Sequence, residues 1–335
     1  MIRQFKLLSI AALALPCAMM TVPTASYAQA YPEANKPITI ILPFPAGGPT
    51  DKAGRDLAVS MGKALGGHTV VIQNVTGASG TIGINRAAKS PNDGYTLLFT
   101  HISQATLPTF FRKLPYNVQN DFEFLGLVSE NPMNLIGRPD LPANNMKELV
   151  AWIQANKNKV NLANAGPGSA AHLCGMMFQS KIGVEITTIP YKGTGPAMTD
   201  LLGGQVDLMC DQTTTTLPQI EGKKVKSFAV TTPQRLTAPA LKDTPTMQES
   251  GFKDFTVTIW QGLYAPKGTP APILKKLNDA LKVAIKDPEF IKRQEQGGAT
   301  MIFDSRNDPE GHRAFVAAET EKWAPVIKAA GAYAD

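Results

Sequence analysis

Three glycine-rich loops and one acidic segment carry the residue types that could do chemistry in this chain. Each follows a short apolar run, and they span residues 43–51, 77–83, 164–172 and 207–214. Glycine lets a backbone approach a ligand closely, and free amides at a helix start can face an anion. Amides, hydroxyls and a few carboxylates suit the binding of a small anion better than the breaking of a bond.

The first loop, Pro43–Asp51, combines a turn at Gly47 and Gly48 with two polar residues. We expect Thr50 to cap the following helix, so that the first-turn amides face a ligand. Asp51 could bind a ligand hydroxyl or ammonium group, or hold a water molecule. The alternative is an ordinary strand-to-helix turn in which Asp51 accepts hydrogen bonds from helix N–H groups.

The second loop places Gly77, Gly80 and Gly83 at intervals of three after an apolar run. This arrangement superficially resembles a dinucleotide-binding fingerprint. The spacing is not Gly-x-Gly-x-x-Gly, however, and no acid follows at the end of a second strand. A turn that exposes amides to a carboxylate fits better, and a tight turn that simply requires glycine is the alternative.

The third loop ends in Ser169, a good N-cap, with His172 in the first turn of the helix. A single histidine at such a position is more often a structural hydrogen-bonding group than a ligand contact. Tyr191 and Lys192 end the next predicted strand and could reach the same cleft, although an exposed Lys192 is the commoner outcome.

The fourth segment ends in Asp211, at the carboxyl end of a predicted strand. Side chains alternate along a strand, which puts Asp207, Met209 and Asp211 on one face. Asp211 could accept a hydrogen bond from a ligand or brace a loop, and bracing is the commoner role.

Patterns typical of metal, nucleotide or covalent chemistry are missing from the sequence. The four histidines, at positions 68, 101, 172 and 312, have no metal-ligand spacing. Gly-x-Ser-x-Gly, the Walker A pattern and His-Glu-x-x-His do not occur. We therefore predict no catalytic residue, no metal and no cofactor.

The N-terminus is typical of an export signal. Residues 1–30 combine two early basic residues, an apolar stretch and small residues before Ala28 and Ala30, so we expect cleavage near one of these alanines and a periplasmic location. Pro16 argues against a lipoprotein acylated at Cys17. Of 33 basic and 27 acidic residues, the mature chain keeps 31 and 27, a net charge of +4. The basic residues are scattered, so we expect no binding to nucleic acid.

Two cysteines remain after export, Cys174 and Cys210. The compartment permits a disulfide, and two buried small apolar side chains are the alternative. The sequence does not choose between them.

Short apolar strands alternate with helical segments in both halves of the chain, which is typical of parallel α/β sheets. Two extended segments, Leu125–Arg138 and Thr256–Pro266, cross between the halves. We predict an α/β fold of two lobes, with lobe 1 from residues 31–130 and 258–335 and lobe 2 from residues 131–257. Ligands bind beyond the carboxyl ends of such strands, which directs all four segments to one cleft.

Seven motifs, in order along the mature chain, resemble the periplasmic substrate-binding proteins of tripartite tricarboxylate transporters, often called Bug-type receptors. They are Pro43–Asp51, Gly77–Gly80, Asp93–Leu98, Gly168–Leu173, Pro190–Gly193, Thr199–Asp207 and Trp260–Pro266. The resemblance implies a periplasmic binding protein fold, with two Rossmann-like lobes that close on a carboxylate. It also implies that the position of Asp211 lies near the far end of the ligand.

Three features depart from the family pattern. Met176 stands where a glutamate is frequent, His101 replaces a smaller residue, and the two cysteines replace small or apolar residues. These departures affect the identity of the ligand and not the class of protein.

We therefore expect a solute-binding protein that captures a small organic acid, aliphatic or aromatic, and delivers it to the permease subunits of a tripartite transporter by hinge closure, working as a monomer. A secreted enzyme acting on small carboxylates and a receptor that feeds a sensor protein are the alternatives. The expected ligand contacts are Phe44, Ala46, Gly47, Gly48, Thr50, Asp51, Gly77, Ala78, Ser79, His101, Gly168, Ser169, Ala170, His172, Tyr191, Asp211 and Thr213.

Overall fold

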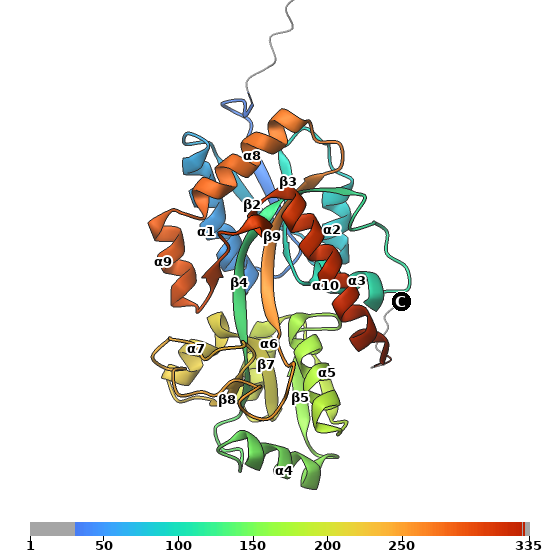
Figure 1. Cartoon of the computed structure of the whole chain (residues 1–335), viewed down its shortest axis with the longest axis vertical. Coiled ribbons are helices and arrows are strands. Elements are labelled where there is room, and N and C mark those ends of the chain that lie inside the picture. Colours follow the sequence, from blue (N-terminus) through green and yellow to red (C-terminus); the bar gives the residue numbers. More distant parts are fainter. Residues whose placement is uncertain (1–30, 330, 332–335) are drawn as a thin grey trace, which may run out of the picture.

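The computed structural model describes residues 31–329 and 331 of the chain. Its helices and strands form two α/β lobes, drawn one above the other in Figure 1. The predicted signal peptide, with its cleavage sites and Cys17, lies outside the described residues.

The first lobe is built on three parallel strands in the order β2-β1-β3. Ile40 and Ile41 of β1 belong to two different buried clusters, so this strand is covered on both faces, which explains its unbroken apolar run. The strands are β1 (Ile38–Leu42), β2 (Val70–Asn74) and β3 (Thr96–His101). The helices are α1 (Pro49–Ala64), η1 (Ala78–Gly80), α2 (Thr81–Ala88), α3 (Ser103–Phe110), α8 (Ala271–Ala284), α9 (Pro288–Gln296), η2 (Ser305–Asn307) and α10 (Pro309–Ala329).

The second lobe repeats this plan with three parallel strands in the order β7-β5-β6. Leu162 and Ala163 of β5 again face different clusters. The strands are β5 (Asn161–Asn164), β6 (Thr187–Pro190), β7 (Leu208–Gln212) and β8 (Lys226–Val230). The helices are α4 (Met146–Asn156), α5 (Ala170–Ile182), α6 (Thr194–Leu202) and α7 (Thr213–Glu221).

Two long antiparallel strands connect the lobes, β4 (Phe122–Gly137) and β9 (Thr258–Pro266). Figure 1 shows them running side by side from one lobe into the other. β4 pairs with β9 and the short β10 (Thr300–Met301) in the first lobe, and with β7 and β8 in the second. The predicted pair of crossing strands is therefore confirmed.

The carboxyl ends of the parallel strands in the two lobes point toward each other. β3 is antiparallel to β9, which is antiparallel to β4, so β3 points along β4 into the second lobe, whereas β7 points back. His101 ends β3 at the level of Ser129 on β4, and Gln212 ends β7 at the level of Met133. Four residues of strand separate these levels, about 13 Å at roughly 3.3 Å per residue. We call the loops that meet here the junction (residues 43–48, 77–80 and 101–103 from the first lobe, and 165–169, 191–193 and 211–213 from the second).

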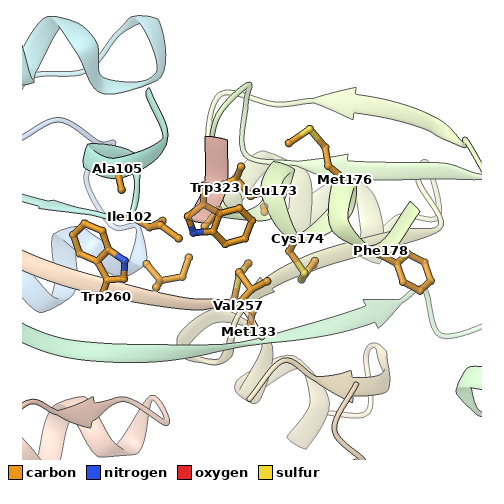
Figure 2. Close-up of a cluster of buried hydrophobic side chains, with 14 of the residues drawn as sticks. Ile102, Ala105, Met133, Leu173, Cys174, Met176, Phe178, Val257, Trp260 and Trp323 are labelled. Atoms are coloured by element: carbon orange, nitrogen blue, oxygen red, sulfur yellow. A yellow bond between two sulfur atoms is a disulfide. The ribbon is translucent and has the colours of Figure 1, made fainter. Parts of the chain in front are cut away.

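A buried cluster that includes side chains of the crossing strands also joins the lobes. Trp323 of α10 shares this cluster with Leu173 and Cys174 of α5 (Figure 2). The indole N–H groups of Trp260 on β9 and Trp323 both donate to Glu319 Oε2, at 3.2 and 3.0 Å. The C-terminal helix of the first lobe therefore packs against the second.

Several predicted element bounds need correction. The first helix begins at Pro49 with Gly48 as its N-cap, so Thr50 is not the cap. Proline is favoured in the first helical turn because its φ is preset and its missing N–H would have no partner there. The sequence did not predict α3, α4, α7 or α9.

Candidate functional site

The loop between β1 and α1 is held by Asp51, which is 3% exposed. Its carboxylate accepts hydrogen bonds from the Gly47 N–H at 2.8 Å, from Arg55 Nε and Nη2 at 2.9 and 3.0 Å, and from Asn74 Nδ2 at 2.8 Å. Burial raises the pKa of Asp51, but the hydrogen bonds from Arg55, Gly47 and Asn74 outweigh it and hold that pKa below the usual value. Asn74 also donates to the Phe44 carbonyl at 3.0 Å. Asp51 thus positions the loop through contacts within the protein.

His101, at the end of β3, is a neutral imidazole next to this loop. Its ring stacks on Phe44 with centroids 4.0 Å apart, and its Nδ1 accepts from the Ser103 N–H at 3.1 Å. Burial lowers the pKa of His101 to about 3. Because Nδ1 is an acceptor in a neutral ring, the proton lies on Nε2, which is a donor.

The loop between β2 and α2 reaches into the other lobe. Ala78 and Ser79 have φ values of 45° and 55°, in the left-handed region that non-glycine residues rarely adopt. The Ser79 hydroxyl donates to the Pro167 carbonyl of the second lobe at 2.6 Å. This predicted ligand contact therefore makes a direct bond between the lobes.

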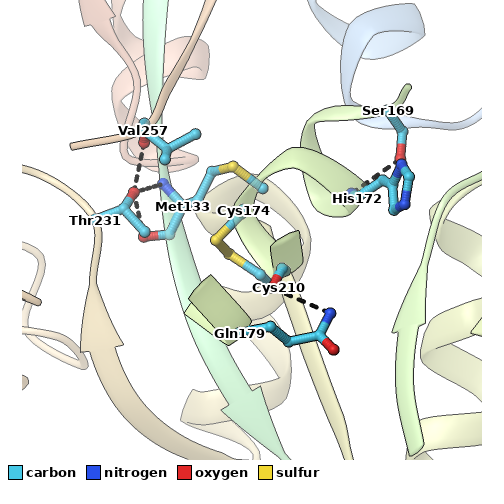
Figure 3. Close-up of a disulfide and its surroundings, with 9 residues drawn as sticks. Met133, Ser169, His172, Cys174, Gln179, Cys210, Thr231 and Val257 are labelled. Carbon is cyan, nitrogen blue, oxygen red and sulfur yellow. Dashed lines mark hydrogen bonds between the residues drawn. A yellow bond between two sulfur atoms is a disulfide. The ribbon is translucent and has the colours of Figure 1, made fainter. Parts of the chain in front are cut away.

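The start of α5 confirms the predicted N-cap. The Ser169 side chain accepts from the His172 N–H at 3.2 Å (Figure 3). His172 Nδ1 in turn accepts from the Gly168 N–H at 3.1 Å. Burial lowers the pKa of His172, so this ring is also neutral. The imidazole therefore holds the loop that precedes the helix, and its role as a ligand contact stays a prediction.

Asp211, at the end of β7, is 2% exposed, and in the part of the chain that the structure describes its side-chain hydrogen-bond partners are two hydroxyls. Thr194 Oγ1 and Thr215 Oγ1 donate to its two oxygens at 3.4 and 2.5 Å. Burial raises the pKa of Asp211 to about 6, although the Thr215, Gln212 N–H and Thr194 hydrogen bonds act in the opposite direction. The hydrogen bonds to Asp211 therefore offset only part of the cost of burying its charged form.

Tyr191 and Thr213 have their hydroxyls committed to protein partners. The Tyr191 hydroxyl donates to Asp200 at 2.7 Å within the second lobe. The Thr213 hydroxyl donates to the Gly297 carbonyl of the first lobe at 2.8 Å. Lys192 is exposed, as expected.

The two sets of loops touch directly across the junction. A Cβ placed on Gly168 would lie 3.3 Å from Leu107 and 3.4 Å from Phe110, and one on Gly193 would lie 3.4 Å from Pro45. Phe110 also makes an edge contact with the His172 ring, with centroids 5.5 Å apart. The described lobes are therefore closed on each other.

The sequence did not identify the residues that form hydrogen bonds with the predicted site residues. These are Arg55, Asn74, Pro167, Thr194 and Thr215. Arg55 was visible as a basic residue four positions after Asp51 on one helix. The other partners come from separate elements, and no local sequence pattern predicts them.

Cys174 and Cys210 form a disulfide between α5 and β7, which resolves the choice that the sequence left open (Figure 3). Both residues are fully buried. Met176, in the same helix, packs in the apolar cluster shown in Figure 2.

Two kinds of feature are not found in the described part of the chain. It holds no group of three or more His, Cys, Asp or Glu side chains suited to a metal ion. None of its helices is both long and apolar enough to cross a bilayer.

Known proteins match this chain over most of its length. Residues 53–332 match the family described as tripartite tricarboxylate transporter family receptor. The structure of the periplasmic binding protein BugD is 47% identical, with a TM-score of 0.84, over 89% of this chain and 99% of that one. MatC of Rhodopseudomonas palustris, with bound malate, is 34% identical with a TM-score of 0.81, over 87% and 98% of the two chains. Rpa4515 of R. palustris, with adipate, is 30% identical with a TM-score of 0.83, over 90% and 99%. The chain therefore belongs to the tripartite tricarboxylate transporter family receptors, the Bug-type periplasmic solute-binding proteins, which are binding proteins and not enzymes.

Proposed function

We propose that this receptor captures a small dicarboxylate or tricarboxylate at the junction and closes over it by bending at β4 and β9. The observation that carries the proposal is the opposition of two helix starts, one from each lobe. The first-turn amides of α1, at Thr50 and Asp51, follow β1, and those of α5, at Ala170 and Ala171, follow β5. Such amides lack intrahelical partners and sit at the positive end of the helix dipole.

A diacid matches this geometry because it offers one carboxylate to each lobe. The strand ends lie about 13 Å apart along β4, a separation similar to the length of a short diacid with its hydrogen-bonding groups. Two solved relatives hold malate and adipate, both small diacids. Neutral donors such as His101 Nε2 and amides then provide recognition, since Arg55 of α1 is already paired with Asp51.

The proposal also covers the bounds of the two lobes, the location of the protein and its membrane partner. Lobe 1 comprises residues 31–130 and 258–335, and lobe 2 comprises residues 131–257. The chain is exported, cleaved near Ala28 or Ala30, and works in the periplasm as a monomer. Its closed form delivers the acid to the permease subunits of a tripartite transporter, as the family description suggests.

A thermal-shift screen of the mature protein against organic acids, including malate and adipate, tests the ligand class. An acid at 100 times its Kd adds about 2.7 kcal/mol of stability, a shift of several degrees. We expect at least one small diacid or triacid to give such a shift. Thermal shifts from non-acids alone would contradict the proposal that the ligand is a carboxylate. A shift that decays as the compound is consumed would contradict binding without turnover.

Ser169→Ala tests the α5 helix start against a matched control, Asn145→Ala. Each side chain caps a helix of the second lobe by accepting from the third amide, and the helix that Asn145 caps, α4, lies at the far end of that lobe (Figure 1). Both changes should lower the free energy of unfolding by about 1 kcal/mol. Only Ser169→Ala should weaken binding of the acid found in the screen, measured by titration calorimetry, and equal affinities in the two variants would remove this helix start from the site.

A further inference from the structure

The Cys174–Cys210 disulfide lies between the two parts of the second lobe that face the junction. Cys210 immediately precedes Asp211 on β7, and Cys174 lies in the second turn of α5, five residues after Ser169. The disulfide therefore connects the strand that ends at Asp211 to the helix that Ser169 caps.

The disulfide is the one directional link between these elements. Among the described residues, no hydrogen bond or ion pair joins α5 to β7. The hydrogen bonds at the start of α5 are local, from the Ser169 N–H to the Gly166 carbonyl and between Gly168, Ser169 and His172. Apolar packing alone tolerates small shifts of a helix over a sheet, whereas a covalent bond fixes the approach.

The strand end is held from both faces. Side chains alternate along β7, so Cys210 faces α5 while Asp211 faces the hydroxyls of Thr194 and Thr215. Met209, on the Asp211 face, shares a cluster with Met198 of α6. The disulfide supplies the fixed contact on the other face.

We propose that the disulfide is a positioning device, which fixes the Ser169 helix start relative to Asp211 so that both meet one ligand. This inference rests on the proposed function. It goes further by assigning to Cys174 and Cys210 an effect on ligand affinity that is separate from their effect on overall stability.

The first test uses amide hydrogen exchange of the full mature chain without ligand. Cys174→Ala/Cys210→Ala is compared with Leu149→Ala, a fully buried residue of α4 far from the junction. Loss of either the disulfide or the Leu149 side chain destabilises by a comparable amount. We expect the double variant to exchange at least tenfold faster than wild type in residues 166–173 and 208–213, and Leu149→Ala to exchange faster only in α4.

The second test measures Kd for L-malate and adipate by calorimetry well below the unfolding temperature. For an acid that wild type binds, the double variant should bind at least tenfold more weakly and Leu149→Ala with unchanged affinity. If wild type binds neither acid, the proposed ligand class fails for both probes, while the exchange experiment still decides the positioning role.

Three results would overturn the inference. The first is exchange at the wild-type rate in both segments of the double variant, and the second is equal acceleration there in Leu149→Ala. The third is wild-type affinity of the double variant for an acid that wild type binds. Should the alanine pair not fold, Cys174→Val/Cys210→Ala fills the space of the sulfurs without a bond, and the same comparison applies.

Discussion

Asp51 and Asp211 are both almost fully buried at strand ends, but their pKa values move in opposite directions. Asp51 has a guanidinium, an amide N–H and an Asn74 donor, and these keep it ionised. Asp211 has hydroxyls and one amide, which do not offset its burial. The sequence placed both acids near the ligand, yet it could not predict this difference, because Asn74, Thr194 and Thr215 come from other elements.

Asp211→Asn tests the protonation of this carboxyl. The folded-state pKa of about 6 lies above the usual 3.8, so the folded chain binds an extra proton between these pH values. The wild-type free energy of unfolding should therefore lose about 2 kcal/mol from Asp211 as the pH rises from 4 to 6, and about 0.4 kcal/mol more as the pH rises further and the folded carboxyl finishes ionising. Asparagine does not ionise, so the variant should gain stability relative to wild type over this range.

Urea unfolding of both proteins at pH 4 and pH 7 measures the difference. Asp279→Asn, at an exposed aspartate of α8, is the control and should show no such trend. A stability difference that is the same at both pH values would mean that Asp211 ionises as in an unfolded chain.

At the scale of elements, the loop before α2 stores backbone strain at Ala78 and Ser79. A left-handed conformation costs a non-glycine residue about 1–2 kcal/mol, and glycine avoids this cost in the folded state. Part of the gain is cancelled because glycine has more conformational entropy to lose when the chain folds. Ala78→Gly should therefore raise the free energy of unfolding by up to about 1 kcal/mol. Ala151→Gly, on an exposed position inside α4, should lower it by about 1 kcal/mol in the same urea experiment, and a loss in both variants would contradict the strain.

The elements that the sequence predicted are those with strong local signals. The crossing strands were visible because long apolar segments without a helical period join the two halves. Helix α3 escaped notice because it contains Pro108 and many hydroxyl residues, and its burial against α10 stabilises it through contacts distant in sequence. Thr50 was misplaced as a cap because the helix begins at Pro49, two residues before the start that a cap at Thr50 would give.

At the scale of the whole molecule, the lobes are joined by polar contacts of their own. Ser79→Ala removes the hydrogen bond to Pro167, which is worth about 0.5–1.5 kcal/mol, so the ratio of closed to open molecules should fall by roughly 2–12-fold. Small-angle X-ray scattering should then record a larger radius of gyration. Ser90→Ala, which removes a hydroxyl bonded locally to Arg86, should leave the radius unchanged, and equal radii for all three proteins would mean that this bond does not bias closure.

The disulfide also affects when the protein becomes able to bind its ligand tightly. Thiols stay reduced in the cytoplasm and pair in oxidising compartments. A newly made chain therefore carries Cys174 and Cys210 as free thiols, and under the proposed positioning role its half-site in the second lobe is still loose. Under that role full affinity arises only after translocation and oxidation, so a precursor binds its ligand at least tenfold more weakly on the side of the membrane where organic acids are being metabolised. The order of biogenesis, and not the folded architecture alone, then determines on which side of the membrane the receptor first takes up its ligand.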